Sequence, residues 1–312
     1  MAGTLKLEAL IAKASAQHAK LLGYEVRWRD RQRFLESKGY MLRPRYRPGW
    51  VPSWFMDKSR PLEEFEDYWD LPVSLCFGVS CVGLQSILKF REHLIDTTRL
   101  SDGKMVYVKH VQTGDLESTI AMMLSSSELL KDPRNHCVPI LDYFQDEDNA
   151  TISYMVMPFL HLTDSPPFKT VENIVDFIEQ TIEGLVFIHE HGVAHRDCSE
   201  KNLMMDVHQL YPEGFHPVLE EFSPDGRTSA RQLSRTNVRV KYYYVDFGIS
   251  VYFPAHQHPK LAVGEYGRDQ DVPELSVEVP YDPFKVDIFI IGNMYKRQLY
   301  NVRVLFYDKR RY

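Results

Sequence analysis

Cysteine is scarce in this chain of 312 residues, which contains only four of them. The four, Cys76, Cys81, Cys137 and Cys198, include no CxxC pair, and their density is far below that of a disulfide-bonded secreted domain. The sequence therefore excludes a disulfide scaffold. We expect reduced thiols and an intracellular protein, either cytoplasmic or nuclear.

Long apolar runs are also missing. The opening 23 residues are interrupted by Lys6, Glu8 and Lys13, so they lack the apolar stretch of a signal peptide. No later segment is long and apolar enough to span a bilayer, and we expect no membrane partner. With 44% hydrophobic and 26% charged residues, the composition is typical of a globular protein with one large core or two moderate ones.

Acidic residues are few among the first 60 residues, which are basic although the whole chain has a formal net charge of -6. Arginines alternate there with aromatic residues, a pattern that superficially resembles a nucleic-acid-binding patch. The arginines follow no recognised module of that kind. Pro44, Pro48 and Pro52 indicate instead an extended strap anchored by its aromatic side chains. We therefore expect no nucleic-acid partner.

The order of the predicted elements is typical of an α+β fold. Two apolar runs around an Asp-Gly turn predict a β-hairpin over residues 93–111. A helix is predicted over 115–130 and a second hairpin over 138–158. A long amphipathic helix is predicted between an N-cap at Thr170 and a stop at Gly192.

Two short motifs carry the chemistry. His195-Arg196-Asp197 is followed by Asn202, and Asp246 opens an Asp-Phe-Gly motif after an apolar strand. Alone, the first motif is a weak signal because three residues recur by chance, and the other interpretation of its aspartate is the cap of a turn. Together, the motifs supply a carboxylate that accepts a hydroxyl proton, and an amide and a carboxylate oxygen that suit Mg²⁺.

These motifs resemble the eukaryotic protein kinase family over about residues 90–295. The segments GYMLRPRYRPGWVPSW, DPRNHCVPILDYF, YPEGFHP and VPYDPFKVDIF are similar to a fungal group of protein-kinase-like proteins. The resemblance implies a bilobal fold, with an extension over 1–75, a small mostly-β lobe over 76–158 and a larger helical lobe over 159–312. It also implies ATP and Mg²⁺ as cofactors, a protein substrate with a Ser or Thr hydroxyl, Asp197 as base, and Asn202 and Asp246 as metal ligands.

Lys109, on the second strand of the first hairpin, resembles the lysine that binds the α- and β-phosphates of ATP. The resemblance implies a glutamate partner on the next helix. Glu117 fits the start of that helix but is only eight residues from the lysine. Glu128 is the alternative, on the same predicted helical stripe.

The resemblance also implies an adenine site on the segment that links the lobes. Met157 matches the gatekeeper position, and Pro158 and Leu160 match the linking residues whose main chain contacts the base. Proline is acceptable because its missing N–H is not used there. Met204, two residues after Asn202, matches the residue beneath the base, although a core methionine explains it equally well.

Several residues depart from the family pattern. No G-x-G-x-x-G precedes the first hairpin, where Glu92 stands near the expected glycines. Tyr107 replaces a small residue above the adenine, and either stacks on the base or blocks it. Ser199 and Gly267 replace a lysine and a threonine that contact each other in the family.

Two further departures concern regulation and length. Without an activation-segment phosphate, Arg196 is expected to pair with a carboxylate of Glu265, Asp269 or Asp271. The sequence ends 25 residues after Asp287, so we expect the large lobe to lack helices that the family has. The sequence thus predicts a protein kinase, and the alternative is a pseudokinase that binds nucleotide or acts as a scaffold without phosphate transfer.

Overall fold

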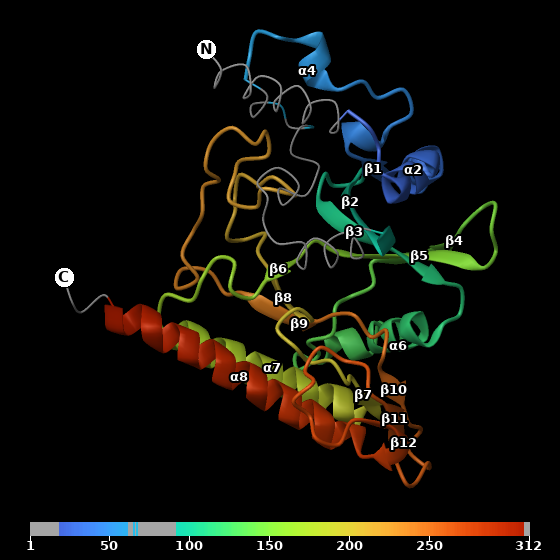
Figure 1. The fold of residues 1–312 in the computed structure, drawn as a ribbon, viewed down its shortest axis with the longest axis vertical. Helices are drawn as coiled ribbons and strands as arrows, with labels where there is room; N and C mark the ends of the chain where they lie inside the picture. Colours follow the sequence, from blue (N-terminus) through green and yellow to red (C-terminus); the bar gives the residue numbers. More distant parts are fainter. Residues whose placement is uncertain (1–18, 62–64, 66, 68–91, 309–312) are drawn as a thin grey trace, which may run out of the picture. The chain divides into compact units, whose positions relative to one another are not determined.

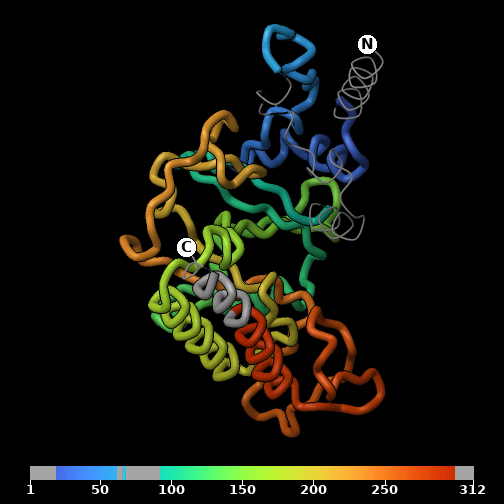
Figure 2. The backbone as a smooth tube through the Cα atoms, turned by 60° about the vertical axis from the view of Figure 1, so that its left-hand side comes forward, coloured from blue at the N-terminus to red at the C-terminus, as the bar shows by residue number. Residues whose placement is uncertain are grey.

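The computed structural model describes residues 19–61, 65, 67 and 92–308. Its chain divides into two compact units (Figures 1 and 2). Unit 1 comprises residues 1–110, 144–159 and 211–232, and unit 2 comprises 111–143, 160–210 and 233–312. Cys76, Cys81 and the opening segment lie outside the described residues, and the thiols of Cys137 and Cys198 are buried.

A five-stranded sheet forms the frame of unit 1, in the order β1-β2-β3-β5-β4. Its strands are β1 (Tyr40–Leu42), β2 (Leu94–Arg99), β3 (Met105–Gln112), β4 (Asp142–Gln145) and β5 (Ile152–Pro158). The two predicted hairpins supply β2 to β5, and β2 pairs antiparallel with β3. The sheet and the accompanying helices confirm the α+β class.

The strand β1 comes from the part of the chain that the sequence assigns to the extension. Tyr40 pairs with Arg99, and Leu42 with Thr97. The connection from β1 to β2 therefore runs through Arg43–His93, rather than being a short glycine loop beside Glu92. Pairing with β2 lets Leu42 be fully buried in the unit 1 core. Local periodicity does not reveal this pairing, because β1 is remote from β2 in the sequence.

Aromatic side chains of the extension build that core. Helices α2 (Gly23–Asp30) and α3 (Gln32–Ser37) precede β1, and the turn η1 (Pro44–Tyr46) and helix α4 (Ser53–Met56) follow it. The largest core cluster of unit 1 combines side chains of the extension with those of β2, β3 and β5: Trp28, Phe34, Leu35, Tyr40, Leu42, Tyr46, Ile95, Val106, Val108, Tyr154 and Val156. The extension is thus packed into the unit and does not lie across it as a strap.

Residues 211–232 also belong to unit 1. They form an insertion between the Asn202 and Asp246 motifs, and its Tyr211 and Phe215 are almost fully buried. The Phe215 ring lies 5.5 Å from that of Phe159 at the end of β5. This insertion therefore anchors itself by aromatic contacts.

Unit 2 contains two long helices, α7 (Val171–Glu190) and α8 (Pro283–Asp308), which run antiparallel and side by side (Figures 1 and 2). The hydroxyls of Thr181 and Tyr295 lie 2.6 Å apart. Thr170 caps α7, because its side chain accepts a hydrogen bond from the amide of Asn173. No helix among the described residues is long and apolar enough to cross a membrane.

Short strands and a helix complete unit 2. A three-stranded sheet has the order β6-β8-β9 and contains β6 (His161–Leu162), β8 (Leu203–Asp206) and β9 (Lys241–Tyr244). A second sheet pairs β7 (Val193–Ala194) with β10 (Val251–Tyr252). A third pairs β11 (Ala262–Gly264) with β12 (Ser276–Tyr281). Helix α6 (Leu116–Leu124) begins at Asp115, whose carboxylate accepts from the Ser118 amide. It is shorter than predicted, and a 3₁₀ turn, η5 (Leu129–Lys131), follows it.

Burial lowers the pKa of His161 on β6 to about 4, with a smaller effect of the same sign from His208 and an opposite one from Asp206. The folded chain keeps this imidazole neutral at a pH where the unfolded chain protonates it. The stability is present above pH 6.5 and is lost as the pH falls toward 4. We expect a loss of about 2 kcal/mol of unfolding free energy between pH 7 and pH 5 from this group. Urea denaturation at both values checks it, and His161→Gln should reduce the pH dependence; an unchanged dependence in the variant would contradict the assignment.

Candidate active site

The two sequence motifs come together in unit 2 beside the antiparallel pair of β8 and β9. The carbonyl of Asn202 accepts a hydrogen bond of 3.0 Å from the amide of Val245. The Nε2 atom of His195 lies 3.1 Å from the carbonyl oxygen of Val245. Val245 directly precedes Asp246, so these contacts bring the catalytic loop and the Asp-Phe-Gly motif side by side.

Asp197 is held by hydrogen bonds to both oxygens of its carboxylate. The Nδ2 atom of Asn202 donates to Oδ2 at 2.8 Å and also to the Asp197 carbonyl at 3.0 Å. The main-chain amide of Arg268 donates to Oδ1 at 2.9 Å. The side chain of Asp197 is half-buried, so this oriented carboxylate still reaches solvent.

A buried aspartate fixes the main chain of the catalytic loop. Asp287 on α8 is fully buried, and its carboxylate accepts from the amides of His195 at 2.8 Å and Arg196 at 2.5 Å. The Nε2 atom of His189 lies 2.8 Å from the same carboxylate. Arg196 has φ 68, a strained conformation for a residue with a side chain. Asp287 therefore holds the main chain of this loop to α8.

The predicted carboxylate partner of Arg196 was wrong. Its guanidinium donates to the carbonyls of Ile249 and Val263, and to the Tyr281 hydroxyl at 2.7 Å. Asp269 and Asp271 bind Arg297 instead. Arg196 thus binds two main-chain carbonyls and a hydroxyl, and the carboxylates of Asp269 and Asp271 are already paired with Arg297.

The glutamate beside Asp246 is Glu117, in the first turn of α6. Both side chains approach Gly248 from the same side. A Cβ placed on Gly248 would lie 3.3 Å from Oδ1 of Asp246 and 3.5 Å from Oε2 of Glu117. The alternative, Glu128, lies outside α6 and is exposed before the η5 turn. Its predicted place on the helical stripe was wrong because the helix ends at Leu124.

Unit 1 holds the lysine and two of the four predicted adenine residues. Lys109 lies on β3, opposite Leu94 of β2, and Met157 and Pro158 end β5. The chain passes into unit 2 between Phe159 and Leu160. Met204 lies on β8 in unit 2 and is half-buried.

Tyr107 occupies the face of β3 next to the linking segment. Its ring stacks on that of Phe159, with centroids 4.4 Å apart and planes inclined by 18°. Phe159 is fully buried and also contacts Phe215. The sequence singles out Tyr107, but its partners lie far along the chain and carry no local signal that would have identified them.

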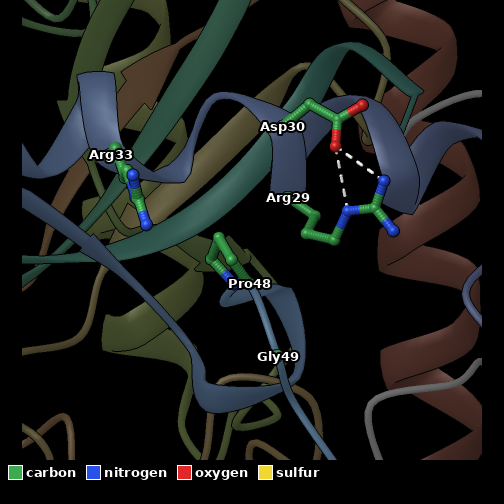
Figure 3. A pocket seen from close by; sticks show the side chains of 5 residues that line it. All are labelled: Arg29, Asp30, Arg33, Pro48 and Gly49. Carbon is green, nitrogen blue, oxygen red and sulfur yellow. Dashed lines mark hydrogen bonds and ion pairs between the residues drawn. The ribbon is translucent and has the colours of Figure 1, made fainter.

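A surface hollow of about 550 Å³ lies elsewhere in unit 1, lined by Arg29, Asp30, Arg33, Pro48 and Gly49 (Figure 3). Its Arg29 guanidinium donates to the Asp30 carboxylate at 2.9 Å and 2.7 Å. This neighbouring pair leaves no converging set of polar groups for a ligand.

Comparisons with known proteins agree with these motifs. Serine/threonine-protein kinase PSK1 of Saccharomyces cerevisiae is 28% identical over 125 residues, which cover 38% of this chain and 8% of the relative. Serine/threonine-protein kinase PSK2 of the same yeast is 23% identical over 172 residues, covering 51% and 15%. Cell division control protein 2 homolog D of Antirrhinum majus is 30% identical over 123 residues, covering 34% and 38%. The chain thus spans well under half the length of these relatives, and no protein-family model matches it.

Proposed function

The chain is related to the protein kinases, and we propose that it is an ATP- and Mg²⁺-dependent protein kinase that phosphorylates a serine or threonine hydroxyl of a protein. One observation carries the proposal. The amide of Asn202 orients the carboxylate of Asp197, while its carbonyl is bonded to Val245, the residue before Asp246. These bonds support a role for Asp197, Asn202 and Asp246 as the three groups that phosphoryl transfer requires.

Asp197 acts as the base in this proposal. In the transfer, the substrate hydroxyl oxygen forms a bond to the γ-phosphorus of ATP, and the bond from that phosphorus to the bridging oxygen breaks to release ADP. The hydroxyl proton passes to the Asp197 carboxylate, which the bonds from Asn202 and Arg268 aim in one direction.

The residues beside Asp197 suit a magnesium ion. Asn202 uses Nδ2 toward Asp197 and keeps Oδ1 as a ligand oxygen, and Asp246 supplies a carboxylate. Hard oxygen donors of this kind are what Mg²⁺ prefers. When bound, the ion would neutralise charge on the phosphate oxygens of ATP. We assign Asn202 and Asp246 to hold it.

The remaining roles follow from the resemblance. Lys109 binds the α- and β-phosphates, with Glu117 as its partner. Met157, Pro158 and Leu160 line the adenine, and Met204 lies beneath it. The proximity of Glu117 to Asp246 supports choosing it over the exposed Glu128.

Transfer of labelled γ-phosphate from ATP to general protein substrates tests the proposal. We expect incorporation of the label to depend on Mg²⁺. After acid hydrolysis of the labelled protein, the label should be recovered as phosphoserine or phosphothreonine. Saturable binding of Mg·ATP in a thermal-shift titration, with no incorporation above a sample lacking the chain, would refute the enzyme and leave a nucleotide-binding protein.

The stacked rings of Tyr107 and Phe159 favour a second candidate, a pseudokinase that acts as a scaffold. The family has a small residue where Tyr107 stands, and here its ring is already paired with the linking segment. Adenine would have to displace this contact. Weak nucleotide affinity then follows, without any change in the base or the metal ligands.

Tyr107→Ala distinguishes the two possible roles of the ring. An aromatic pair contributes about 0.5–1.5 kcal/mol beyond its buried area, so removing a blocking ring should raise the affinity for Mg·ATP by about three- to tenfold. Isothermal titration of both proteins measures it. Weaker binding in the variant would mean that Tyr107 stacks on the base instead. Tyr143→Ala makes the same substitution on β4, away from this ring pair, and serves as the matched control.

A further inference from the structure

A main-chain group contacts the proposed base at the place where two family side chains are missing. Ser199 and Gly267 stand at the positions of the lysine and threonine that meet beside this carboxylate in the family. The amide of Arg268 nevertheless donates to Oδ1 of Asp197 at 2.9 Å. We propose that this amide is the positioning group that orients Asp197 in place of the missing side chains, an inference that rests on the proposed function.

Glycine at position 267 makes this approach possible. Gly267 has φ +142, a conformation that residues with a side chain rarely adopt. A Cβ at this position would lie 3.2 Å from the carbonyl oxygen of Arg196. Gly267 therefore removes the threonine side chain and, in doing so, lets the next amide reach Asp197.

Arg196 fixes the chain on the N-terminal side of Gly267. The guanidinium of Arg196 binds the carbonyl of Val263 at 3.0 Å and the hydroxyl of Tyr281 at 2.7 Å. That hydroxyl donates to the carbonyl of Gly264 at 2.7 Å. These bonds join the catalytic loop to the β11–β12 pair, three residues before Gly267.

A second anchor lies directly after Arg268. Asp269 is buried, and its carboxylate accepts from Nδ2 of Asn293 at 3.0 Å and from Arg297 at 3.1 Å, both on α8. The side chain of Gln270 also donates to the carbonyl of Gly267 at 2.7 Å. The amide of Arg268 is thus held between two fixed points, which is what a positioning group needs.

The contact leaves Asp197 able to accept a proton. A carboxylate has about four acceptor sites on its two oxygens. Asn202 and Arg268 each occupy one, on different oxygens. The remaining sites face a substrate hydroxyl, so the amide orients the base rather than blocking it.

Two variants of Arg268 separate the amide from the side chain. Arg268→Ala and Arg268→Pro both lose the exposed guanidinium, but only proline lacks the N–H. Because bonds to charged groups are strong, kcat of the proline variant should be about tenfold or more below that of the alanine variant, with KM for ATP within about twofold. Equal kcat values, or a faster proline variant, would overturn the inference.

Hydrogen exchange of the Arg268 amide, followed by NMR, tests the contact without turnover. In the full chain the exchange should be at least about tenfold slower than in Asp197→Ala, which removes the acceptor. Exchange that is equally fast in both proteins would overturn the inference even if the chain is an active kinase. If the proposed function fails instead, no variant transfers phosphate but the protection by Asp197 persists. The exchange measurement also decides the question if the proline variant does not fold.

Discussion

Replacing Asp197 by asparagine is expected to lower kcat for phosphate transfer by about 10²- to 10⁴-fold, the usual contribution of a positioned base. Asparagine is close to aspartate in shape, yet it does not accept the hydroxyl proton. The affinity for Mg·ATP should change little, because Asp197 is assigned neither to the metal nor to the nucleotide. Initial rates at saturating ATP, together with a separate binding titration, measure the two quantities.

The control for this variant is Asp164→Asn, at an exposed position without a hydrogen bond to a described residue. It makes the same chemical change and should leave the rate unaltered. An Asp197→Asn protein as active as the wild type would remove Asp197 from the proposed mechanism. Loss of nucleotide binding together with rate would indicate that the substitution disturbs the loop and not the base alone.

The proximity of Asp197, Asn202 and Asp246 was accessible from the sequence because it follows from short-range rules. Asn202 lies five positions after Asp197. Asp246 comes two residues after the end of β9, whose partner β8 begins directly after Asn202. The positions that sequence reasoning missed act through the main chain. Nearly every residue has a main-chain amide, so the residue type at position 268 does not indicate that the Arg268 amide contacts Asp197.

The same distinction applies to the fold. The hairpins and α7 follow from local periodicity and caps, and their positions were predicted to within a few residues. The strand β1 and the insertion depend on contacts between remote segments, such as Leu42 in the unit 1 core and Phe215 beside Phe159. Burial of apolar surface selects these contacts, and a single sequence records which side chains are apolar but not which ones meet.

Removing the guanidinium of Arg45 is expected to have the largest effect on stability. Arg45 and Glu25 are both fully buried, and Nε of Arg45 donates to Oε1 of Glu25 at 2.7 Å. Arg45→Met leaves a buried carboxylate without its cation, which typically costs about 3–5 kcal/mol. All four tryptophans lie within the first 69 residues, so the urea dependence of tryptophan fluorescence reports on unit 1.

Two further variants give this measurement its meaning. Arg33→Met makes the same change at an exposed position and should stay within about 0.5 kcal/mol of the wild type. The double variant Glu25→Leu with Arg45→Met should regain much of the loss, because apolar side chains replace a buried ion pair with little penalty. If Arg45→Met costs less than about 1 kcal/mol, the extension does not unfold cooperatively with the sheet. If Arg45→Met is strongly destabilised and the double variant regains the stability, the basic, aromatic extension is an integral part of the unit 1 core. The strands β2 and β3, and hence Lys109, then depend on it.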